Sequence, residues 1–403
     1  MRVLFVSDVY FPRVNGVSTS IATFRADLAA CGVETTLVAP CYPGAEEESG
    51  VVRIPATAVP GDPEDRRMRW RTLVRTLAGL AREGHDLVHV QTPFLAHYAG
   101  VRHARRVRIP CVATYHTYFE EYLHHYAPLL PRALGRPLAR AFTRSQCREV
   151  DALIAPSEPL REVLLDYGVT TPIHVLPTGL PADRFVPGDG KRFRALAGLP
   201  VDRPLLLYVG RVAHEKNIAF LLHAYARIRA RVPQSMLVVA GEGPARAALV
   251  ELASRLGLGK DVSFVGYLDR ERTLADCYAA ADAFVFASRT ETQGLVLLEA
   301  MAQGVPVIST AVLGTRSVLQ RESGALVVEE QLEEFSSAAV RLLGSASLRT
   351  ELAGRARAYA QRWSSVSMAR RLAELYREVS DARAAETRAV GTPRQRASTS
   401  PDA

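Results

Sequence analysis

Short apolar runs alternate with helical patterns along most of the chain, and this alternation restricts the possible folds more than any other feature. Runs rich in β-branched residues, such as RVLFVSD, ETTLVAP and DALIAPS, are separated by segments in which apolar residues recur at helical spacing. Strands that are joined through helices pair in parallel, with helices on the faces of the sheet. The pattern therefore predicts an α/β fold built on parallel sheets.

A change in composition divides the chain into two parts. Pro and Gly become frequent in 172–190, PIHVLPTGLPADRFVPGDG, and the alternation then begins again with PLLLYVGR. A chain of 403 residues can form two or three domains with separate cores. We predict α/β domains over 1–182 and 183–375, a hinge near 180–190, and final helices that can return to the first domain. The segment 383–403, rich in Ser, Thr, Pro and Arg, predicts a disordered tail.

The cysteines and the N-terminus indicate the compartment. The five cysteines show neither a Cys-x-x-Cys pair nor regular spacing, which argues against a disulfide framework and a zinc site. The opening MRVLFVSDVYF reads as a first strand, and no run reaches the ~18 apolar residues of a spanning helix. We expect a soluble protein in the reducing cytoplasm, which would meet a membrane only peripherally, on its inner face.

The chain contains five short motifs in a fixed order: DVYFPRVNGVSTS, YVGRVAHEKN, AGEGP, FVGY and TETQGLVLLEAMAQGVPVIS. In this order they resemble the retaining glycosyltransferases of family 4, over about residues 1–375. Each motif alone is weak, because Gly-x-Gly turns and pairs of Glu on helices are common. The resemblance implies the GT-B fold, in which two Rossmann-like domains face a cleft. It also implies transfer of a hexose from a nucleotide sugar with retention of configuration.

Two cations are candidates for stabilising a departing nucleotide diphosphate. Such a leaving group needs its negative charge offset by a metal, or by fixed cations and amide dipoles. The sequence has no Asp-x-Asp pair to hold a metal, whereas Arg211 and Lys216 flank a loop between a predicted strand and helix. Open α/β sheets bind ligands at that edge. We expect both side chains to clamp the diphosphate without a metal or other cofactor; the alternative is two solvated surface cations.

The segment TETQGLVLLEAMAQ places Glu291 in a loop and Glu299 inside the helix that follows. Gly294 opens this helix, so free N–H groups at its start can face a phosphate or a sugar hydroxyl. The resemblance assigns Glu291 to the donor sugar, Glu299 to the ribose hydroxyls, and Gln293, Gly294 and Leu295 to the donor site. The alternative, a solvated Glu299, is disfavoured because its apolar neighbours predict burial, and a lone buried carboxylate is costly.

Further candidates follow other predicted strands. Gly16, beside Asn15, lets the backbone approach the donor phosphate or the acceptor, although a plain turn would have the same sequence. His116 ends the strand CVATYH; the resemblance places it against the donor sugar, and a structural histidine is the alternative. The motifs GEGP and FVGY correspond to loops that cradle the base. They give four donor-binding candidates: Gly241, Gly243, Val265 and Gly266.

The acceptor is indicated by basic and aromatic segments in the first part of the chain. Residues 65–148 contain 15 Arg and 5 acidic residues. Within them, RRMRWRTLVRTLAGLAR places Trp70, Leu73, Leu77 and Leu80 at helical spacing among arginines, a pattern suited to an anionic lipid surface. The alternative is that this apolar face packs on the first sheet. No nucleic-acid-binding module is recognisable, so nucleic acid is not expected as a partner.

The segment HTYFEEYLHHY resembles the matching segment of diacylglycerol glycosyltransferases, and with Asn15 it gives Tyr118 and Tyr122 as acceptor residues. TETQGL is closer to glucosyl-type members than to the Glu-x-Phe-Gly of mannosyl-type members, which favours UDP-glucose as donor. The favoured function is therefore glucosyl transfer to a lipid such as diacylglycerol. A GDP-mannose-dependent or other hexosyltransferase with a soluble, polysaccharide or glycolipid acceptor is the alternative, followed by a non-catalytic nucleotide-sugar binding protein.

Overall fold

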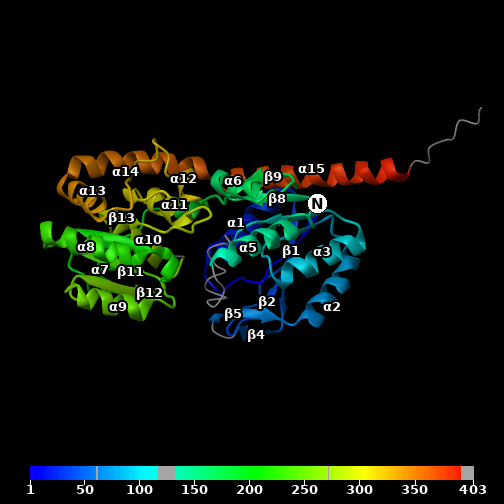
Figure 1. Ribbon diagram of the computed structural model, residues 1–403, viewed down its shortest axis with the longest axis horizontal. Coiled ribbons are helices and arrows are strands. Elements are labelled where there is room, and N and C mark those ends of the chain that lie inside the picture. Colours follow the sequence, from blue (N-terminus) through cyan, green and yellow to red (C-terminus); the bar gives the residue numbers. More distant parts are fainter. Residues whose placement is uncertain (60–61, 117–131, 271, 392–403) are drawn as a thin grey trace, which may run out of the picture.

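The computed structural model describes residues 1–59, 62–116, 132–270 and 272–391. These residues form two domains, each built on a parallel sheet with helices packed against it (Figure 1). This confirms the predicted α/β class with two Rossmann-like domains. The central strands are covered on both faces; in the first strand, for example, Val3 to Val6 are fully buried. Their continuous apolar runs are what a parallel sheet covered on both sides requires.

The sheet of the first domain has the order β3-β2-β1-β6-β7-β8-β9. Its strands are β1 (Arg2–Val6), β2 (Glu34–Pro40), β3 (Val51–Ile54), β6 (Leu87–Val90), β7 (Cys111–Thr114), β8 (Ala152–Ala155) and β9 (Ile173–Val175). A separate antiparallel pair is formed by β4 (Ala56–Val59) and β5 (Asp62–Met68). The helices of this domain are α1 (Gly16–Leu28), α2 (Trp70–Leu80), α3 (Leu95–Val107), α5 (Arg132–Cys147) and α6 (Glu158–Asp166).

The sheet of the second domain has the order β12-β11-β10-β13-β14-β15. Its strands are β10 (Leu205–Val209), β11 (Met236–Ala240), β12 (Val262–Gly266), β13 (Ala283–Phe286), β14 (Val307–Ser309) and β15 (Ala325–Val327). Its helices are α7 (Gly190–Leu196), α8 (Ile218–Arg231), α9 (Arg246–Arg255), α10 (Thr273–Ala279), α11 (Leu295–Ala302), α12 (Thr315–Val318), α13 (Leu332–Gly344) and α14 (Ala346–Ala360).

Each sheet has one point where the strand order reverses direction. In the first sheet this point lies between β1 and β6, and in the second it lies between β10 and β13. The connections that leave these neighbouring strands go to opposite sides, which opens a crevice at the carboxyl ends where such sheets bind ligands. The loops after these four strands are therefore the expected positions of functional side chains.

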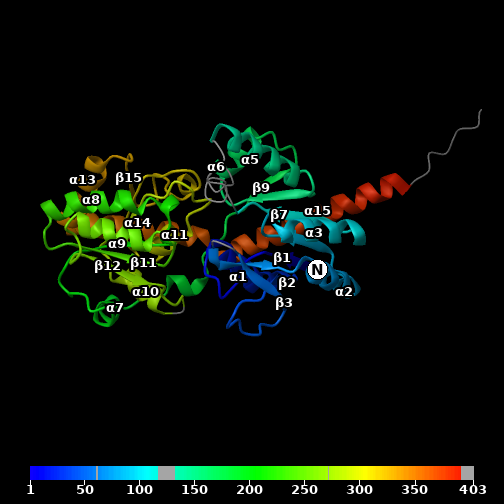
Figure 2. The ribbon, with the colours of Figure 1, turned by 60° about the horizontal axis from the view of Figure 1, so that its bottom comes forward.

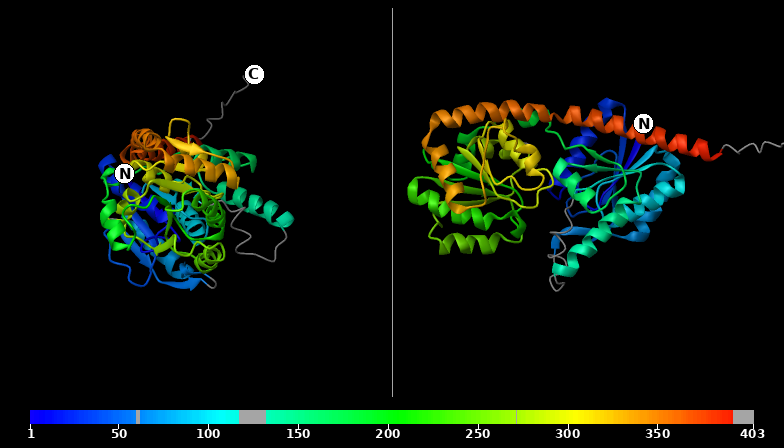
Figure 3. Two further views of the ribbon diagram at one scale, coloured as in Figure 1. Left: turned by 90° about the vertical axis from the view of Figure 1, so that its left-hand side faces the viewer. Right: turned by 45° about the horizontal axis from the view of Figure 1, so that its top comes forward.

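The last helix, α15 (Ser365–Gly391), returns to the first domain. It packs on α1, and Met368, Leu372 and Tyr376 are part of the core beside that helix. Figure 2 and the right panel of Figure 3 show α14 and α15 following one another across both domains. Between the domains the chain crosses twice, and the crossings touch: the Leu180 N–H donates to Trp363 O at 2.6 Å, and the Ser365 N–H donates to Leu180 O at 3.0 Å.

The tail prediction is wrong in its first part, because α15 continues through Gly391. The segment after residue 382 lacks an apolar period but is rich in Ala, Glu and Arg, which are good helix formers. A helix that is already nucleated by packing on α1 can extend through such residues without a second nucleation cost. Residues 392–403 lie outside the described part of the chain.

The basic segment also departs from its prediction. Arg66 and Arg67 belong to β5 and not to a helix. In α2, Leu73 and Leu77 are at most 1% exposed and pack in the core of the first domain, whereas Trp70 is 38% exposed. The leucine face is therefore not available to a lipid surface. This agrees with the alternative interpretation, in which the apolar face packs on the first sheet. The exposed residues of this segment include Trp70 and five arginines: Arg67, Arg69, Arg71, Arg75 and Arg82.

Tyr376 anchors α15 to the first sheet through a buried hydrogen bond. Its hydroxyl lies 2.6 Å from His89 Nδ1, and His89 Nε2 lies 2.7 Å from Thr114 Oγ1. Replacing Tyr376 with Phe should lower the free energy of unfolding by about 1 to 3 kcal/mol, because a buried ring nitrogen loses its partner. Denaturant titration followed by circular dichroism measures this loss.

The control variant for this measurement is Tyr98→Phe, since Tyr98 is 43% exposed on α3. It should change the free energy of unfolding by about 0.5 kcal/mol or less. Equal losses in the two variants would contradict the anchoring role of Tyr376.

Candidate active site

Lys216 and Glu291 meet at the switch point of the second sheet. Glu291 lies in the loop after β13, and Lys216 ends the short 3-10 helix η4 (His214–Lys216) that follows β10. Lys216 Nζ donates to Glu291 Oε1 at 2.6 Å, and both side chains are mostly buried. The two residues are 75 positions apart in sequence. They come together because β10 and β13 are neighbours in the sheet.

Arg211 lies in the same loop as Lys216, directly after β10. Its Nη1 is 3.8 Å from Glu215 Oε1, and the Tyr208 hydroxyl donates to its carbonyl oxygen at 3.2 Å. Burial raises the pKa of Tyr208 well above its usual value, and the nearby Glu291 and Glu215 carboxylates raise it further. The two predicted cations and Glu291 thus form one group, in which each cation already faces a carboxylate.

Glycine is required where the loops after β10 and β11 cross. Gly241 has φ 131°, and a Cβ atom there would lie 2.0 Å from Gly210 O; at Gly243 it would lie 2.4 Å from Val212 O. The Val212 N–H donates to Glu242 O at 2.8 Å and holds the crossing together. Gly266 ends β12 with φ 76°, and its carbonyl accepts from the Gly241 N–H at 2.8 Å. The AGEGP and FVGY motifs therefore shape one backbone surface beside Arg211, and Val265 is half-buried next to it.

Gly294 directly precedes α11 and has φ 94°, a left-handed conformation that favours glycine. Leu295 is the first residue of the helix. The N–H groups at the start of a helix carry a partial positive charge, so this end suits an anion. It directly follows the loop that contains Glu291, so the helix start and the carboxylate are neighbours; binding of an anion there stays a prediction.

Glu299 is buried in α11, but its carboxylate is not alone. The Tyr278 hydroxyl donates to Glu299 Oε2 at 3.0 Å, and the Arg270 guanidinium forms an ion pair with Oε1. The Glu299 carboxylate raises the pKa of Arg270. A buried ion pair is thus a structural role that the sequence analysis did not consider. The assignment of Glu299 to the ribose stays a prediction, and its burial no longer argues for it.

Gln293 was predicted to bind the donor, but its amide is engaged elsewhere. Its Nε2 donates to Thr178 O at 2.7 Å, and its Oε1 accepts from the Thr178 N–H at 2.8 Å. Thr178 follows β9, so this pair joins the Glu291 loop to the first domain. The sequence gives no signal for such a contact, because Gln293 and Thr178 are 115 residues apart.

In the first domain, Asn15 and Gly16 form the start of α1. The Asn15 side chain caps the helix by accepting from the Ser18 N–H at 2.8 Å, which is a structural use of the predicted acceptor residue. At Gly16 a Cβ atom would meet nothing within 4 Å, so the backbone is open to a ligand there. Tyr118 and Tyr122, the other acceptor candidates, lie outside the described residues.

His116 follows β7, and its Nε2 lies 3.2 Å from Gln91 Oε1. Burial lowers the pKa of His116 to about 4, so the ring is neutral near pH 7. A neutral ring can donate or accept a hydrogen bond from a sugar hydroxyl without adding charge. Small cavities adjoin it, and one of these is also lined by His89, Thr114 and Thr178.

Asp8 is a residue that the sequence analysis missed. It follows β1 at the switch point of the first sheet, where its carboxylate accepts from Thr92 Oγ1 at 2.8 Å and from the Ala96 N–H at 3.1 Å. Burial raises its pKa to about 6. The carboxylate thereby caps the start of α3. Its place at the end of RVLFVSD, next to the first predicted strand, is the signal that could have identified it.

Comparisons with known proteins identify families and relatives that this chain resembles. Residues 14–184 match the family described as Glycosyltransferase Family 4, and residues 190–362 match Glycosyl transferases group 1. The chain is 35% identical over 318 residues to an alpha-monoglucosyldiacylglycerol synthase of Streptococcus pneumoniae, covering 77% of this chain and 71% of that protein. It is 29% identical over 379 residues to a GDP-mannose-dependent alpha-mannosyltransferase of Mycobacterium tuberculosis, covering 90% and 93%.

Among solved structures, the chain is similar to sucrose-phosphate synthase from Thermosynechococcus elongatus. The TM-score is 0.79 with 26% sequence identity, and the match covers 95% of this chain and all of the other. The two-domain fold therefore has a counterpart in a known structure.

If Arg211 and Lys216 stabilise a departing diphosphate, replacing either by Ala should lower turnover by roughly 10²-fold or more, because a preorganised cation is lost from the transition state. Steady-state kinetics of the purified variants measures this loss. The matched control is Lys260→Ala, since Lys260 is exposed beyond α9. Rates near those of the unmodified protein in both Arg211 and Lys216 variants would rule out the clamp.

Proposed function

Because the chain belongs to the glycosyltransferases of family 4 and group 1 and has the GT-B fold, we propose that it transfers glucose from UDP-glucose to a lipid acceptor such as diacylglycerol. The observation that carries this proposal is the contact between Lys216 and Glu291 at 2.6 Å, with Arg211 in the same loop and the start of α11 directly beyond Glu291. This arrangement offers cations and amides to a diphosphate, and a carboxylate to a sugar hydroxyl.

We propose that transfer retains the configuration at the sugar carbon. The bond between that carbon and the diphosphate oxygen breaks, and the acceptor hydroxyl forms its bond on the same face. The acceptor proton passes to the departing phosphate oxygen, so the step needs no protein base. Arg211, Lys216 and the N–H groups at the start of α11 stabilise the charge on the diphosphate. Glu291 orients the hexose, and His116 faces it from the first domain.

The choice of donor and acceptor rests on sequence similarity. The TETQGL segment and the likeness to the glucosyldiacylglycerol synthase both favour UDP-glucose and a lipid. In the described ranges, no helix has the length and apolar character needed to cross a bilayer. We propose that the enzyme acts in the cytoplasm, on the inner face of the membrane. An anionic lipid surface could bind the exposed residues at the start of α2. These are Trp70, Arg71 and Arg75 in the helix and Arg69 just before it.

A second candidate function is transfer of mannose from GDP-mannose to a sugar or glycolipid acceptor. The similarity to the mannosyltransferase extends over 90% of this chain, further than that to the synthase. The loops assigned to the base, at Gly241 and Gly266, are shaped by backbone contacts, so they give no reason to prefer one base over the other.

The test is a transfer assay with the purified full chain. Radiolabelled UDP-glucose and GDP-mannose are each offered with diacylglycerol in vesicles, with or without anionic lipid, and with soluble sugars. We expect glucosyldiacylglycerol as product, faster transfer on anionic vesicles, and activity that persists in excess EDTA. Transfer from GDP-mannose to a sugar alone would establish the second candidate. Abolition by EDTA would contradict stabilisation of the diphosphate without a metal.

Substitutions of Glu291 and Glu299 should have different effects on the affinity for UDP. Glu299→Gln should weaken binding of UDP by about 1 to 3 kcal/mol, because a charge-assisted hydrogen bond to the ribose is lost while the contacts with Arg270 and Tyr278 can persist. Glu291→Gln should leave UDP affinity intact and lower turnover. Isothermal titration with UDP distinguishes the two. Equal losses of UDP affinity would mean that the ribose and hexose assignments are wrong.

A further inference from the structure

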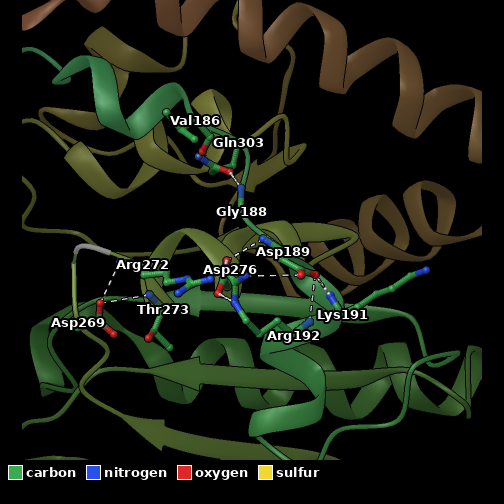
Figure 4. Close-up of polar contacts among 10 residues, drawn as sticks. All are labelled: Val186, Gly188, Asp189, Lys191, Arg192, Asp269, Arg272, Thr273, Asp276 and Gln303. Atoms are coloured by element: carbon green, nitrogen blue, oxygen red, sulfur yellow. Dashed lines mark hydrogen bonds and ion pairs between the residues drawn. The ribbon is translucent and has the colours of Figure 1, made fainter.

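The chain segment between the domains runs alongside α11 and is held at both ends by a glutamine. Before the helix, Gln293 binds the backbone N–H and C=O of Thr178 at 2.8 and 2.7 Å. After the helix, Gln303 accepts from the Gly188 N–H at 3.0 Å and donates to Val186 O at 2.9 Å (Figure 4). Both glutamines are buried, and both use their side-chain amide to bind backbone.

The two glutamines differ in what they hold. Gly188 belongs to the second domain, because the next residue, Asp189, donates its N–H to Asp276 on α10 at 2.7 Å, and Asp276 also binds Arg192 of α7 (Figure 4). Thr178 is tied to the first domain, since its Oγ1 lies 2.7 Å from Ser20 Oγ of α1, and both hydroxyls are buried. Gln303 therefore makes contacts within one domain, whereas Gln293 joins the two.

The residue before Gln293 is also held by the first domain. Ser157, at the start of α6, donates from its hydroxyl to Thr292 O at 2.6 Å and is 1% exposed. From the second domain, the Gly314 N–H donates to Glu291 O at 2.9 Å, and a Cβ atom at Gly314 would lie 2.1 Å from Thr292 O. The loop is thus enclosed between the domains, with Glu291 one residue away from the interdomain bonds.

We infer that Gln293 is a positioning residue for glycosyl transfer. By binding Thr178 it fixes the Glu291 loop against the first domain, and so sets where a hexose on Glu291 lies relative to His116 and the acceptor. This inference rests on the proposed function, in which Glu291 meets the donor sugar. It gives Gln293 a role that differs from the donor binding predicted from the sequence, because both ends of its amide already bind the Thr178 backbone. A displacement of about 1 Å at a reacting centre can cost roughly 10²-fold in rate.

The test compares Gln293→Met with Gln303→Met. Each replaces a buried amide with an apolar side chain of similar length, and each leaves backbone groups without their partner, so both should lower the melting temperature. Gln293→Met should lower kcat about 10- to 100-fold with the Kd of UDP unchanged, whereas Gln303→Met should keep kcat within about 2-fold. Ser157→Ala removes only the hydrogen bond from α6 to Thr292 O in the Glu291 loop. It should show the effects of Gln293→Met more weakly, and it takes the place of that variant if Gln293→Met does not fold.

Three results would overturn the inference. A Gln293→Met variant with the kcat of the unmodified protein would leave Gln293 only a structural role. An equal loss of kcat in Gln303→Met would mean that turnover depends on the whole segment between the domains and not on the Gln293 contact in particular. A loss of UDP affinity in Gln293→Met would restore the donor-binding role predicted from the sequence.

A measurement without substrate separates this inference from the proposed function. Small-angle scattering of the ligand-free proteins should show a broader distribution of interatomic distances for Gln293→Met than for Gln303→Met, because only the first loses an interdomain bond. Identical distributions would contradict the inference. If the unmodified protein fails to transfer glucose from UDP-glucose to diacylglycerol, the proposed function is wrong, and the scattering comparison still tests the interdomain role of Gln293.

Discussion

The proximity of Lys216 and Glu291 depends on one topological constraint, the reversal of strand order between β10 and β13. Adjacent parallel strands end at the same edge of the sheet, so residues 75 positions apart meet at 2.6 Å. The reversal keeps helices away from this edge, because the connections leave to opposite sides. The first sheet repeats the arrangement between β1 and β6, where Asp8 and Gln91 lie. Each domain thus presents its functional loops at a single edge.

Joining the two edges requires contacts that a single domain cannot supply. The two chain crossings pack so closely that a Cβ atom at Gly179 would lie 2.5 Å from the Ser365 backbone N. Beyond them, α15 returns to the first domain, where Tyr376 binds His89 beside the strand that leads to His116. The Gln293 amide then ties the Glu291 loop to Thr178. The relative position of donor and acceptor groups therefore rests on a few buried polar bonds as well as on apolar packing.

The sequence predicted those features that depend on local pattern. Continuous apolar runs identified the buried strands, and the glycines of AGEGP indicated a loop, in which a Cβ atom at Gly241 would lie 2.0 Å from Gly210 O. It could not predict partners that are distant in sequence: the pairing of Glu299 with Arg270, or of Gln293 with Thr178. Periodicity also did not reveal that the leucines of α2 face the core and not a lipid surface, because an amphipathic helix has the same pattern in both settings.

We propose that the diphosphate of the donor binds between the loop of Arg211 and Lys216 and the start of α11. A crystal structure of the protein with UDP is the decisive measurement. We expect phosphate oxygens within hydrogen-bonding distance of Lys216 Nζ, the Arg211 guanidinium and the N–H groups at the start of α11, with the ribose toward Glu299. A diphosphate bound away from these groups, with Lys216 still paired only with Glu291, would show that this placement is wrong.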